Sequence, residues 1–311
     1  MKFEKALVTG GAGFIGSHLV EELLKQNVKV LVVDNLLTGK KSNIDKLDNV
    51  ETIYDDLGSD ASLRAIETFN PDVCFHLAAQ SSVVISVEDP LLDFEHNLLQ
   101  PIKLLQKLIH TDCKKFVFSS SGGTIFGEPN IIPTSEIDYA GEPVSPYGVA
   151  KKKLNDFIKV ILQDTNMSYS ILNLANVYGP RQDPHGEAGV LSIFTGKMLN
   201  NETPIVYGDG NQTRDYIFVK DVVSALIKSS EIDENLFLNI GTSKETTVNE
   251  LVSLIGSITS WEGKPDYKPR RDGELLRSVL SNEKAIKSLD WEPEYNLNRG
   301  IAELVDWFKN E

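Results

Sequence analysis

The sequence predicts an α/β protein whose centre is a doubly wound parallel sheet, joined to a smaller, interleaved C-terminal α/β lobe. In the first half, short runs rich in Val, Ile and Leu alternate with segments whose apolar residues recur at i, i+3 and i+4. Continuous apolar strands between amphipathic helices are typical of a parallel sheet that helices cover on both faces. A glycine-rich turn, Gly10 to Gly16, follows the first apolar run and opens the first helix. A strand, a glycine turn and a helix in that order indicate a βαβ unit.

The expected elements follow this alternation along the chain. Strands are expected over residues 5–10, 28–34, 50–56, 72–79, 114–121 and 167–179, with a last one over 235–241. Helices are expected over 17–26, 61–69 and 98–109, and from Tyr147 onward. After Gly179 the pattern becomes irregular, starting with a loop rich in Gly, Pro and charge, and such long loops are often functional. We therefore expect a sheet domain of residues 1–176 and about 214–242, a second lobe of 177–213 and 243–311, and a ligand between them.

Composition and charge limit the kinds of partner. The net charge of −14 argues against nucleic acid, which needs a basic surface. Any anionic ligand must therefore be held by local arginines and helix N-termini. The two cysteines, Cys74 and Cys113, lie outside any ligand-spaced cluster, so we expect reduced thiols and no metal site. The N-terminus runs into a strand without the apolar segment of a signal peptide, and no apolar run approaches the roughly 18 residues of a membrane span. These features predict a cytoplasmic protein.

The glycine turn has the spacing of a dinucleotide-binding loop. Gly11, Gly13 and Gly16 form G-x-G-x-x-G, and Gly10 with Gly13 and Gly16 forms a wider set. Glycines there allow a tight turn and let the backbone approach a pyrophosphate at a helix N-terminus. Asp34 ends the second strand about 20 residues on, where a carboxylate would bind an adenosine ribose hydroxyl and repel a 2′-phosphate. The sequence therefore predicts a Rossmann domain that binds NAD in preference to NADP.

Two lysines and several strand ends complete the prediction for the cofactor. Lys40 and Lys41 lie close to Asp34 and leave NADP open as an alternative. The other predicted cofactor contacts stand in the first helical turn, at the ends of strands or on the helices beside them: Phe14, Ile15, Asn35, Leu36, Thr38, Gly39, Asp56, Leu57, Leu77, Ala78, Ala79, Gln80, Asn97 and Ser119.

Tyr147 and Lys151 stand four residues apart at the start of a predicted helix, so their side chains share one face. Pro146 suits the first helical turn. A phenol has a pKa of about 10 and is a poor base at neutral pH. A neighbouring ammonium and a cationic nicotinamide would favour the phenolate and lower that pKa. The pair therefore suits proton transfer during hydride transfer, and it is also expected among the cofactor contacts.

At this point the chain resembles a known family. The segments "TGGAGFIG", "DNL", "HLAAQ", "SSSGG…FGE", "SPYGVAK" and "NVYGPRQDPHGEAGV" are similar to those of the extended short-chain dehydrogenase/reductases, and within them the UDP-sugar 4-epimerases. "TRDYIFVKDV" and "PRRDGELLRSVLS" extend the resemblance through the second half. It implies a UDP-hexose substrate, a tightly held NAD and a transient 4-keto sugar.

The resemblance also implies roles for individual residues. Tyr147 is implied as the base that takes the proton of the sugar 4-hydroxyl, and Lys151 as the residue that binds the nicotinamide ribose. A serine or threonine at the end of the fifth strand would share that proton. The usual position is Gly122 here, so Ser121 is the expected residue and Thr124 the alternative. A further departure is Phe126 in place of the usual tyrosine.

The resemblance implies a substrate site in the second lobe. Arg214 and Arg271 are expected to grip the UDP pyrophosphate, since arginine binds phosphate oxygens in a bidentate manner. The remaining implied substrate contacts, beside Ser121 and Thr124, are Asn176, Gly189, Val190, Ile205, Tyr207, Glu274 and Ser278. Ser278 stands where a tyrosine can restrict relatives to glucose and galactose. A smaller side chain leaves room for a 2-N-acetyl group, which predicts that UDP-GlcNAc and UDP-GalNAc are also accepted.

Four other functions are weighed against 4-epimerisation. A sugar-nucleotide 4,6-dehydratase typically needs an Asp-Glu pair where Gly122 and Gly123 stand, and a UDP-glucuronate decarboxylase a Glu there. A UDP-glucuronate-type epimerase shares the fold and cofactor. A non-catalytic NAD-binding sensor or scaffold would tolerate loss of Tyr147 or Lys151, and both are present. Family members are often dimers, and the amphipathic segments 98–109 and 151–162 are candidates for the interface of a homodimer.

Overall fold

The computed structural model describes residues 2–138, 141–184, 189–270 and 275–311. The centre of this part of the chain is a seven-stranded sheet in the order β11-β6-β5-β4-β1-β2-β3, with every neighbouring pair parallel. Its strands are β1 (Lys5–Thr9), β2 (Lys29–Val33), β3 (Val50–Ile53), β4 (Val73–His76), β5 (Lys115–Ser121), β6 (Ser168–Leu174) and β11 (Leu236–Ile240). The predicted doubly wound parallel sheet is confirmed.

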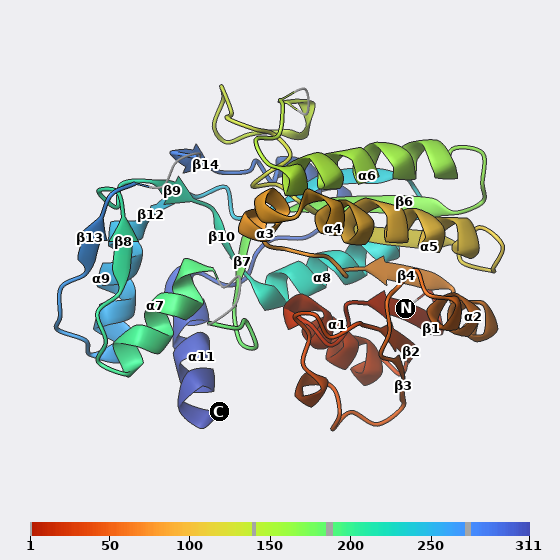
Figure 1. Cartoon of the computed structure of the whole chain (residues 1–311), viewed down its shortest axis with the longest axis horizontal. Helices are drawn as coiled ribbons and strands as arrows, with labels where there is room; N and C mark the ends of the chain where they lie inside the picture. The colour runs from red at the N-terminus through yellow and green to blue at the C-terminus, as the bar shows by residue number, and fades with distance from the viewer. Residues whose placement is uncertain (1, 139–140, 185–188, 271–274) are drawn as a thin grey trace.

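Helices cover both faces of the sheet (Figure 1). One face carries α1 (Phe14–Lys25), α8 (Val219–Ser230) and α10 (Glu283–Leu289), and the other carries α2 (Asp60–Phe69), α5 (Gln100–Leu108) and α6 (Pro146–Leu162). Successive residues of a strand therefore enter different cores: Ala6 and Val8 face α1 and α8, whereas Leu7 faces the opposite layer. Helices cover both faces, so the central strands are largely apolar, as in the buried run Val30 to Val33 of β2.

Two expected elements differ from the structure. The segment 167–179 forms two strands, because the chain leaves the sheet at Ala175 and continues as β7 (Asn176–Tyr178), paired with β10 (Tyr216–Phe218). The helix expected over 98–109 forms the end of a longer helical stretch. This stretch consists of α3 (Val83–Glu88), α4 (Pro90–Phe94), the π-helical turn η2 (Glu95–Leu99) and α5. A π-turn widens the helix by one residue and often marks a functional site.

The second lobe packs its own core beside the sheet. Its helices are α7 (Val190–Leu199), α9 (Val248–Thr259) and α11 (Leu297–Asn310), which gather at one end of the molecule in Figure 1. Its short strands are β8 (Ile205–Tyr207), β9 (Thr213–Arg214), β12 (Thr246–Thr247), β13 (Asp266–Lys268) and β14 (Arg277–Ser278). β9 lies between β12 and β14, and β8 pairs with β13. The 3₁₀ turns η1 (Lys41–Asn43) and η3 (Glu136–Asp138) lie in connecting segments.

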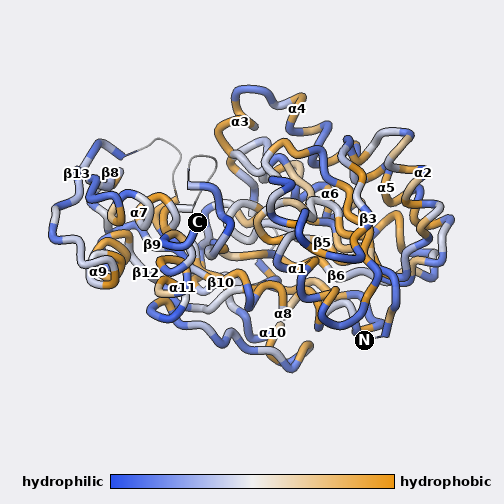
Figure 2. Tube along the Cα trace, turned by 90° about the horizontal axis from the view of Figure 1, so that it is seen from below, coloured by the Kyte–Doolittle hydropathy of each residue, from blue (hydrophilic) through white to orange (hydrophobic). Residues whose placement is uncertain are grey.

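Hydropathy follows this arrangement: in Figure 2 hydrophobic colour marks many of the helices and strands, and hydrophilic colour marks much of the connecting chain. Within the described ranges, no helix has the length and apolar character needed to cross a membrane.

Candidate active site

A cavity of about 570 Å³ lies at the carboxyl ends of the central strands. Residues at or just after the ends of β1, β2, β4 and β5 line it, and so does the loop after β7. β1 and β4 are neighbours at the point where the strand order reverses. In open α/β sheets this is where ligands bind.

The glycine turn forms the floor of the cavity and depends on the absence of side chains. Gly10 has φ +71°, and a Cβ there would lie 2.7 Å from the backbone N of Ala78 on the neighbouring strand's extension. A Cβ on Gly16 would lie 2.1 Å from the carbonyl O of Gly10, so turn and helix can pack closely only with glycine. Gly13 is the N-cap of α1 and offers no side chain to the helix. The first N–H groups of α1 are therefore left for an anionic ligand.

Asp34 follows β2 and is 6% exposed. Its carboxylate accepts hydrogen bonds from the backbone N–H of Ala12 (2.9 Å) and of Leu36 (2.8 Å). Burial raises the pKa of Asp34, and these two hydrogen bonds oppose the rise. Asp34 thus holds the glycine turn against the second strand in addition to standing at the predicted ribose position.

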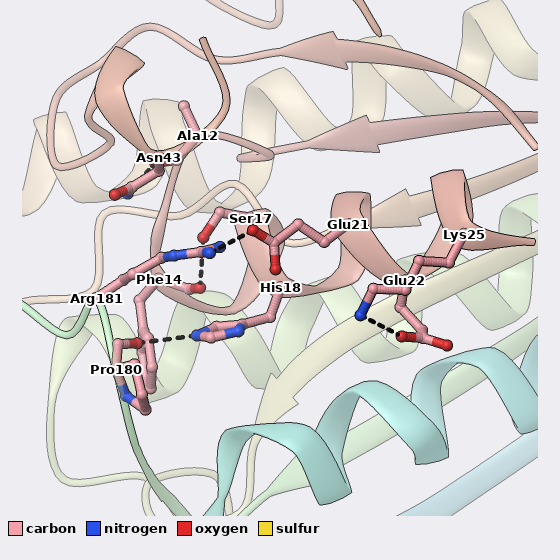
Figure 3. Close-up of polar contacts among 10 residues, drawn as sticks. All are labelled: Ala12, Phe14, Ser17, His18, Glu21, Glu22, Lys25, Asn43, Pro180 and Arg181. Carbon is pink, nitrogen blue, oxygen red and sulfur yellow. Dashed lines mark hydrogen bonds and ion pairs between the residues drawn. The ribbon is translucent and has the colours of Figure 1, made fainter. Parts of the chain in front are cut away.

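The loop after β7 lies against α1 and closes one side of the cavity (Figure 3). The imidazole Nε2 of His18 and the carbonyl O of Pro180 are 2.9 Å apart, and Arg181 pairs with Glu21 of α1. Arg181 has φ +68°, and its Nη1 is buried without a partner within the described residues. Arg181 lines the cavity beside the N-terminus of α1, and an arginine at this place suits an anionic group.

Tyr147 and Lys151 stand on one face of α6, as predicted. Lys151 is 3% exposed, and its ammonium donates to the carbonyl O of Ser119 at 3.1 Å. The ammonium also lies 4.8 Å from the ring centre of Phe118 and 5.8 Å from that of Tyr147. Contacts of a desolvated cation with ring faces are favourable. The α6 start is fixed by Ser145, whose Oγ accepts the N–H of Gly148 at 3.2 Å.

The structure distinguishes the two hydroxyl candidates. The side chain of Ser121, the last residue of β5, is hydrogen-bonded to the Tyr147 hydroxyl. Thr124 instead directs its hydroxyl to the carbonyl O of Ser121 at 3.5 Å. Because Gly122 donates its N–H to the carbonyl O of Leu174, β5 keeps its register up to Ser121 and then turns.

The buried surroundings shift the pKa values of both Tyr147 and Lys151. Burial raises the pKa of Tyr147 to about 12, the hydrogen bond from Ser121 opposes the rise, and the charge of Asp93 adds to it. Burial lowers the pKa of Lys151 to about 8, and Asp93 opposes that fall. Desolvation is the largest effect on the pKa of Tyr147, and the Lys151 ammonium contacts the rings and Ser119. The lowering expected from the ammonium together with a cationic nicotinamide stays a prediction. Both groups carry their protons at neutral pH in this state.

Comparison with known proteins identifies the family. Residues 6–241 match the model of the "NAD dependent epimerase/dehydratase family". The chain belongs to this family. The structure of the UDP-glucose 4-epimerase of Thermotoga maritima with UDP-glucose has a TM-score of 0.95 and 42% identity, over 98% of this chain and 99% of that one. The Thermus thermophilus UDP-glucose 4-epimerase with NAD has a TM-score of 0.91 and 39% identity, over 98% and 99%. The UDP-N-acetylglucosamine 4-epimerase of Methanobrevibacter ruminantium has a TM-score of 0.93 and 33% identity, over 100% and 99%.

NAD is the cofactor of this family, and the cavity fits it. The cavity extends from the acidic strand end at Asp34, past the bare N-terminus of α1, to Ser119 beside Lys151. These features suit an adenosine ribose, a diphosphate and a nicotinamide ribose in that order.

Most predicted cofactor contacts lie in the cavity wall. The predicted residues that line it are Gly10, Gly13, Phe14, Ile15, Gly16, Asp34, Asn35, Thr38, Gly39, Leu57, Leu77, Ala78, Ala79, Gln80 and Ser119. Five predicted cofactor contacts are not part of this wall: Leu36, Asp56, Asn97, Tyr147 and Lys151. Asp56 instead accepts a hydrogen bond from the Asn35 amide at 2.8 Å, and Asn97 is buried behind Gln80, to whose carbonyl O its amide donates at 2.8 Å. Their contact with NAD stays a prediction.

None of the described residues among the predicted substrate contacts lines this cavity wall. Arg214 of β9 and Ser278 of β14 are register partners and therefore lie side by side. Asn176 begins β7, Gly189 is the N-cap of α7 and Val190 its first residue, and Ile205 and Tyr207 are the ends of β8. Arg271 and Glu274 lie outside the described residues.

Sequence reasoning missed part of the wall. The missed lining residues are Val33, Leu37, Lys40, Asn43, Asp55, Ser81, His96, Gln100, Val177, Arg181, Gln182 and Asp183. The last three come from the loop whose Gly, Pro and charge content marked it as functional, but no motif assigned its side chains. Lys40 and Asp183 are 3.6 Å apart, so this loop is also tied to the loop after β2.

Proposed function

We propose that this protein is an NAD-dependent UDP-hexose 4-epimerase that interconverts UDP-glucose and UDP-galactose. The observation that supports it most directly is the hydrogen bond between Ser121 and the Tyr147 hydroxyl, next to the buried Lys151 and the nicotinamide end of the cavity. The kinship with the T. maritima enzyme, which was solved with UDP-glucose, supports the choice of substrate.

The residues of the chain supply the proton chemistry. Tyr147 takes the proton of the sugar 4-hydroxyl, and Ser121 bonds to the same oxygen and keeps it aligned. Bound NAD⁺ supplies the hydride acceptor, and a cationic ring beside Tyr147 favours its phenolate. Lys151 adds a second positive charge and holds its place through Ser119. The hydride taken from C4 would come back from the same cofactor to the other face of the 4-keto sugar, while Tyr147 returns the proton to O4. The net reaction therefore inverts C4 and leaves every group as it began.

Packing at Gly122 supports epimerisation over dehydration or decarboxylation. A Cβ on Gly122 would lie 2.3 Å from Cδ1 of Leu280, which is buried, and 3.1 Å from the carbonyl O of Leu174. The acidic residue that a dehydratase typically needs there would not fit without moving the end of β6 or Leu280. Gly123 has open space around it, so only the first of the two positions is closed by packing.

The direct test is product analysis with purified protein that receives no added NAD. We expect bound nucleotide in the preparation and conversion of UDP-galactose to UDP-glucose. UDP-glucose, UDP-GlcNAc and UDP-glucuronate should be compared side by side. Loss of water or of carbon dioxide from any of them, with no 4-epimer formed, would overturn the proposal.

We infer in addition that the N-acetylated pair is accepted. Ser278 is small and stands beside Arg214, a predicted pyrophosphate contact. The similarity to a UDP-N-acetylglucosamine 4-epimerase supports this wider substrate range. Ser278→Tyr should abolish turnover of UDP-GlcNAc and retain that of UDP-glucose, whereas a wild-type protein inactive on UDP-GlcNAc would exclude it.

We further propose a homodimer formed by the outer faces of α3, α4 and α6. These helices pack together and expose apolar side chains, among them Leu91 (82% exposed), Val160 (70%) and Val87 (64%). The hydrophobic colour of α3 lies at the edge of the molecule in Figure 2. Light scattering should give twice the mass of the 34.5 kDa chain, and Val160→Glu should shift it toward the monomer.

A further inference from the structure

Asp93 of α4 is a fully buried carboxylate that the proposed reaction does not use. Its Oδ1 accepts hydrogen bonds from Nε2 of Gln80 and from Nδ2 of Asn97, both at 2.8 Å. Its Oδ2 is buried and has no hydrogen-bond partner within the described ranges. A carboxylate that is buried away from water, with one oxygen that accepts no hydrogen bond, stays ionised only if a positive charge lies nearby.

The positive charge comes from the neighbouring helix. α4 packs against α6, and Lys151 of α6 is as fully enclosed as Asp93. The Lys151 ammonium has a carbonyl oxygen and two ring faces around it, and among the described residues no carboxylate lies within ion-pair distance. Two buried, opposite charges on packed helices, neither with a direct ion pair, interact strongly because little water screens them.

We propose that Asp93 is the counter-ion that keeps the Lys151 ammonium charged in this dry pocket, and that it thereby sets the pH range in which the Tyr147–Lys151 pair works. Asp93 is a positioning residue in this role, since it reaches the reacting atoms only through the pair. The inference rests on the proposed function, because it concerns the same proton transfer.

Among the described residues, the charged groups that act on Asp93 are Lys151 of α6 and His96 of η2. From α6, Lys151 and Tyr147 face Asp93, and from η2 the charge of His96 acts on it weakly. On β4, His76 is buried and lies near Lys151, and burial lowers its pKa to about 3, so it stays neutral. Among the residues that the structure describes, Asp93 is thus the one charged group that raises the pKa of both Lys151 and Tyr147.

The direction of the effect follows from this arrangement. Without the negative charge, Lys151 loses its proton at a lower pH and Tyr147 also becomes a phenolate at a lower pH. The acid limb and the basic limb of the pH profile of kcat/KM should therefore both move to lower pH. For buried charges on two packed helices we expect a shift of about one pH unit. If Asp93 served only to anchor Gln80 and Asn97, its replacement would lower the rate and leave the limbs in place.

Asp93→Asn in the holoenzyme, assayed with UDP-galactose from pH 5 to 10, tests the proposal, because Asn keeps the Oδ1 acceptor and removes the charge. Glu95→Gln is the matched control: it removes a carboxylate two residues away, one that pairs with Lys103 at 3.5 Å on the surface. We expect the displaced profile with Asp93→Asn and the wild-type profile with Glu95→Gln.

Asp93→Ser removes the same charge without a new buried amide, and it replaces Asp93→Asn should that variant not fold. If a folded, NAD-loaded Asp93 variant shows a pH profile with both limbs at the wild-type pH values, the inference about Asp93 is overturned. The epimerase proposal would still stand. A wild-type protein without turnover of any UDP-sugar would instead overturn the proposed function.

Discussion

The two ends of the cavity are built in different ways. The diphosphate end comes from one continuous segment, β1, the glycine turn and the start of α1, and it works through backbone N–H groups and missing side chains. The nicotinamide end is assembled from β4, α4, β5 and α6, and it works through side chains whose charge states depend on burial. Changes at the first end should therefore alter cofactor binding, and changes at the second should alter rate and pH dependence.

The largest effect is expected at the nicotinamide end. Tyr147→Phe removes the hydroxyl that carries the proton and keeps the ring. We expect kcat to fall by about 10²–10⁴-fold, measured as conversion of UDP-galactose. Bound NAD, measured in the denatured supernatant, should stay at the wild-type level. A parallel loss of NAD would show that the two ends are not separable.

At the diphosphate end, the substitution that corresponds to Tyr147→Phe is Gly16→Ala. The new Cβ would lie 2.1 Å from the backbone O of Gly10, and overpacking of this kind costs roughly 1–3 kcal/mol. We expect purified protein with little NAD and a lower melting temperature. Gly123→Ala is the control, since nothing lies within 4 Å of its Cβ position. Equal losses in both variants would contradict the packing argument.

Ser121→Ala compared with Thr124→Ala sharpens the assignment within the nicotinamide end. Removing Ser121 takes away the hydrogen bond that lowers the pKa of Tyr147, so the acid limb of the pH profile should move to higher pH. Loss of one such bond corresponds to about 1–3 kcal/mol, or roughly a 5- to 150-fold fall in kcat/KM. Thr124→Ala should change kcat/KM by less than about threefold. The reverse ranking would make Thr124 the partner of Tyr147.

The smallest effect concerns the loop that lies on α1. Burial lowers the pKa of His18 from 6.5 to about 4. Between these two pH values the unfolded chain binds a proton that the folded protein does not, so stability rises with pH across this window and is lost on acidification. His18→Gln removes this titration. The melting temperature of the variant should therefore depend less on pH between 4 and 6.5 than that of the wild type. If the melting temperature of the variant changes with pH as steeply as that of the wild type, the role assigned to His18 is wrong.

Much of this fold could be predicted from local sequence because its signals are local. Most of the seven strands contain short runs of apolar residues, and the glycine turn is marked by the spacing of its glycines within seven residues. The 167–179 segment was less predictable: its apolar pattern continues through Ala175, but only hydrogen bonds to Ile240 and Asp215 decide where it leaves the sheet.

The sequence by itself determined the doubly wound sheet, the dinucleotide loop with Asp34, and the shared face of Tyr147 and Lys151, because each depends on spacing along one segment. The tertiary structure decided that Ser121 meets Tyr147, that Arg181 lines the cavity wall, and that Asp93 acts on the pair. It also decided the direction of both pKa shifts. Electrostatic energy depends on distance in space and on exclusion of water, and residues 93, 121 and 151 acquire both only when β5, α4 and α6 pack together.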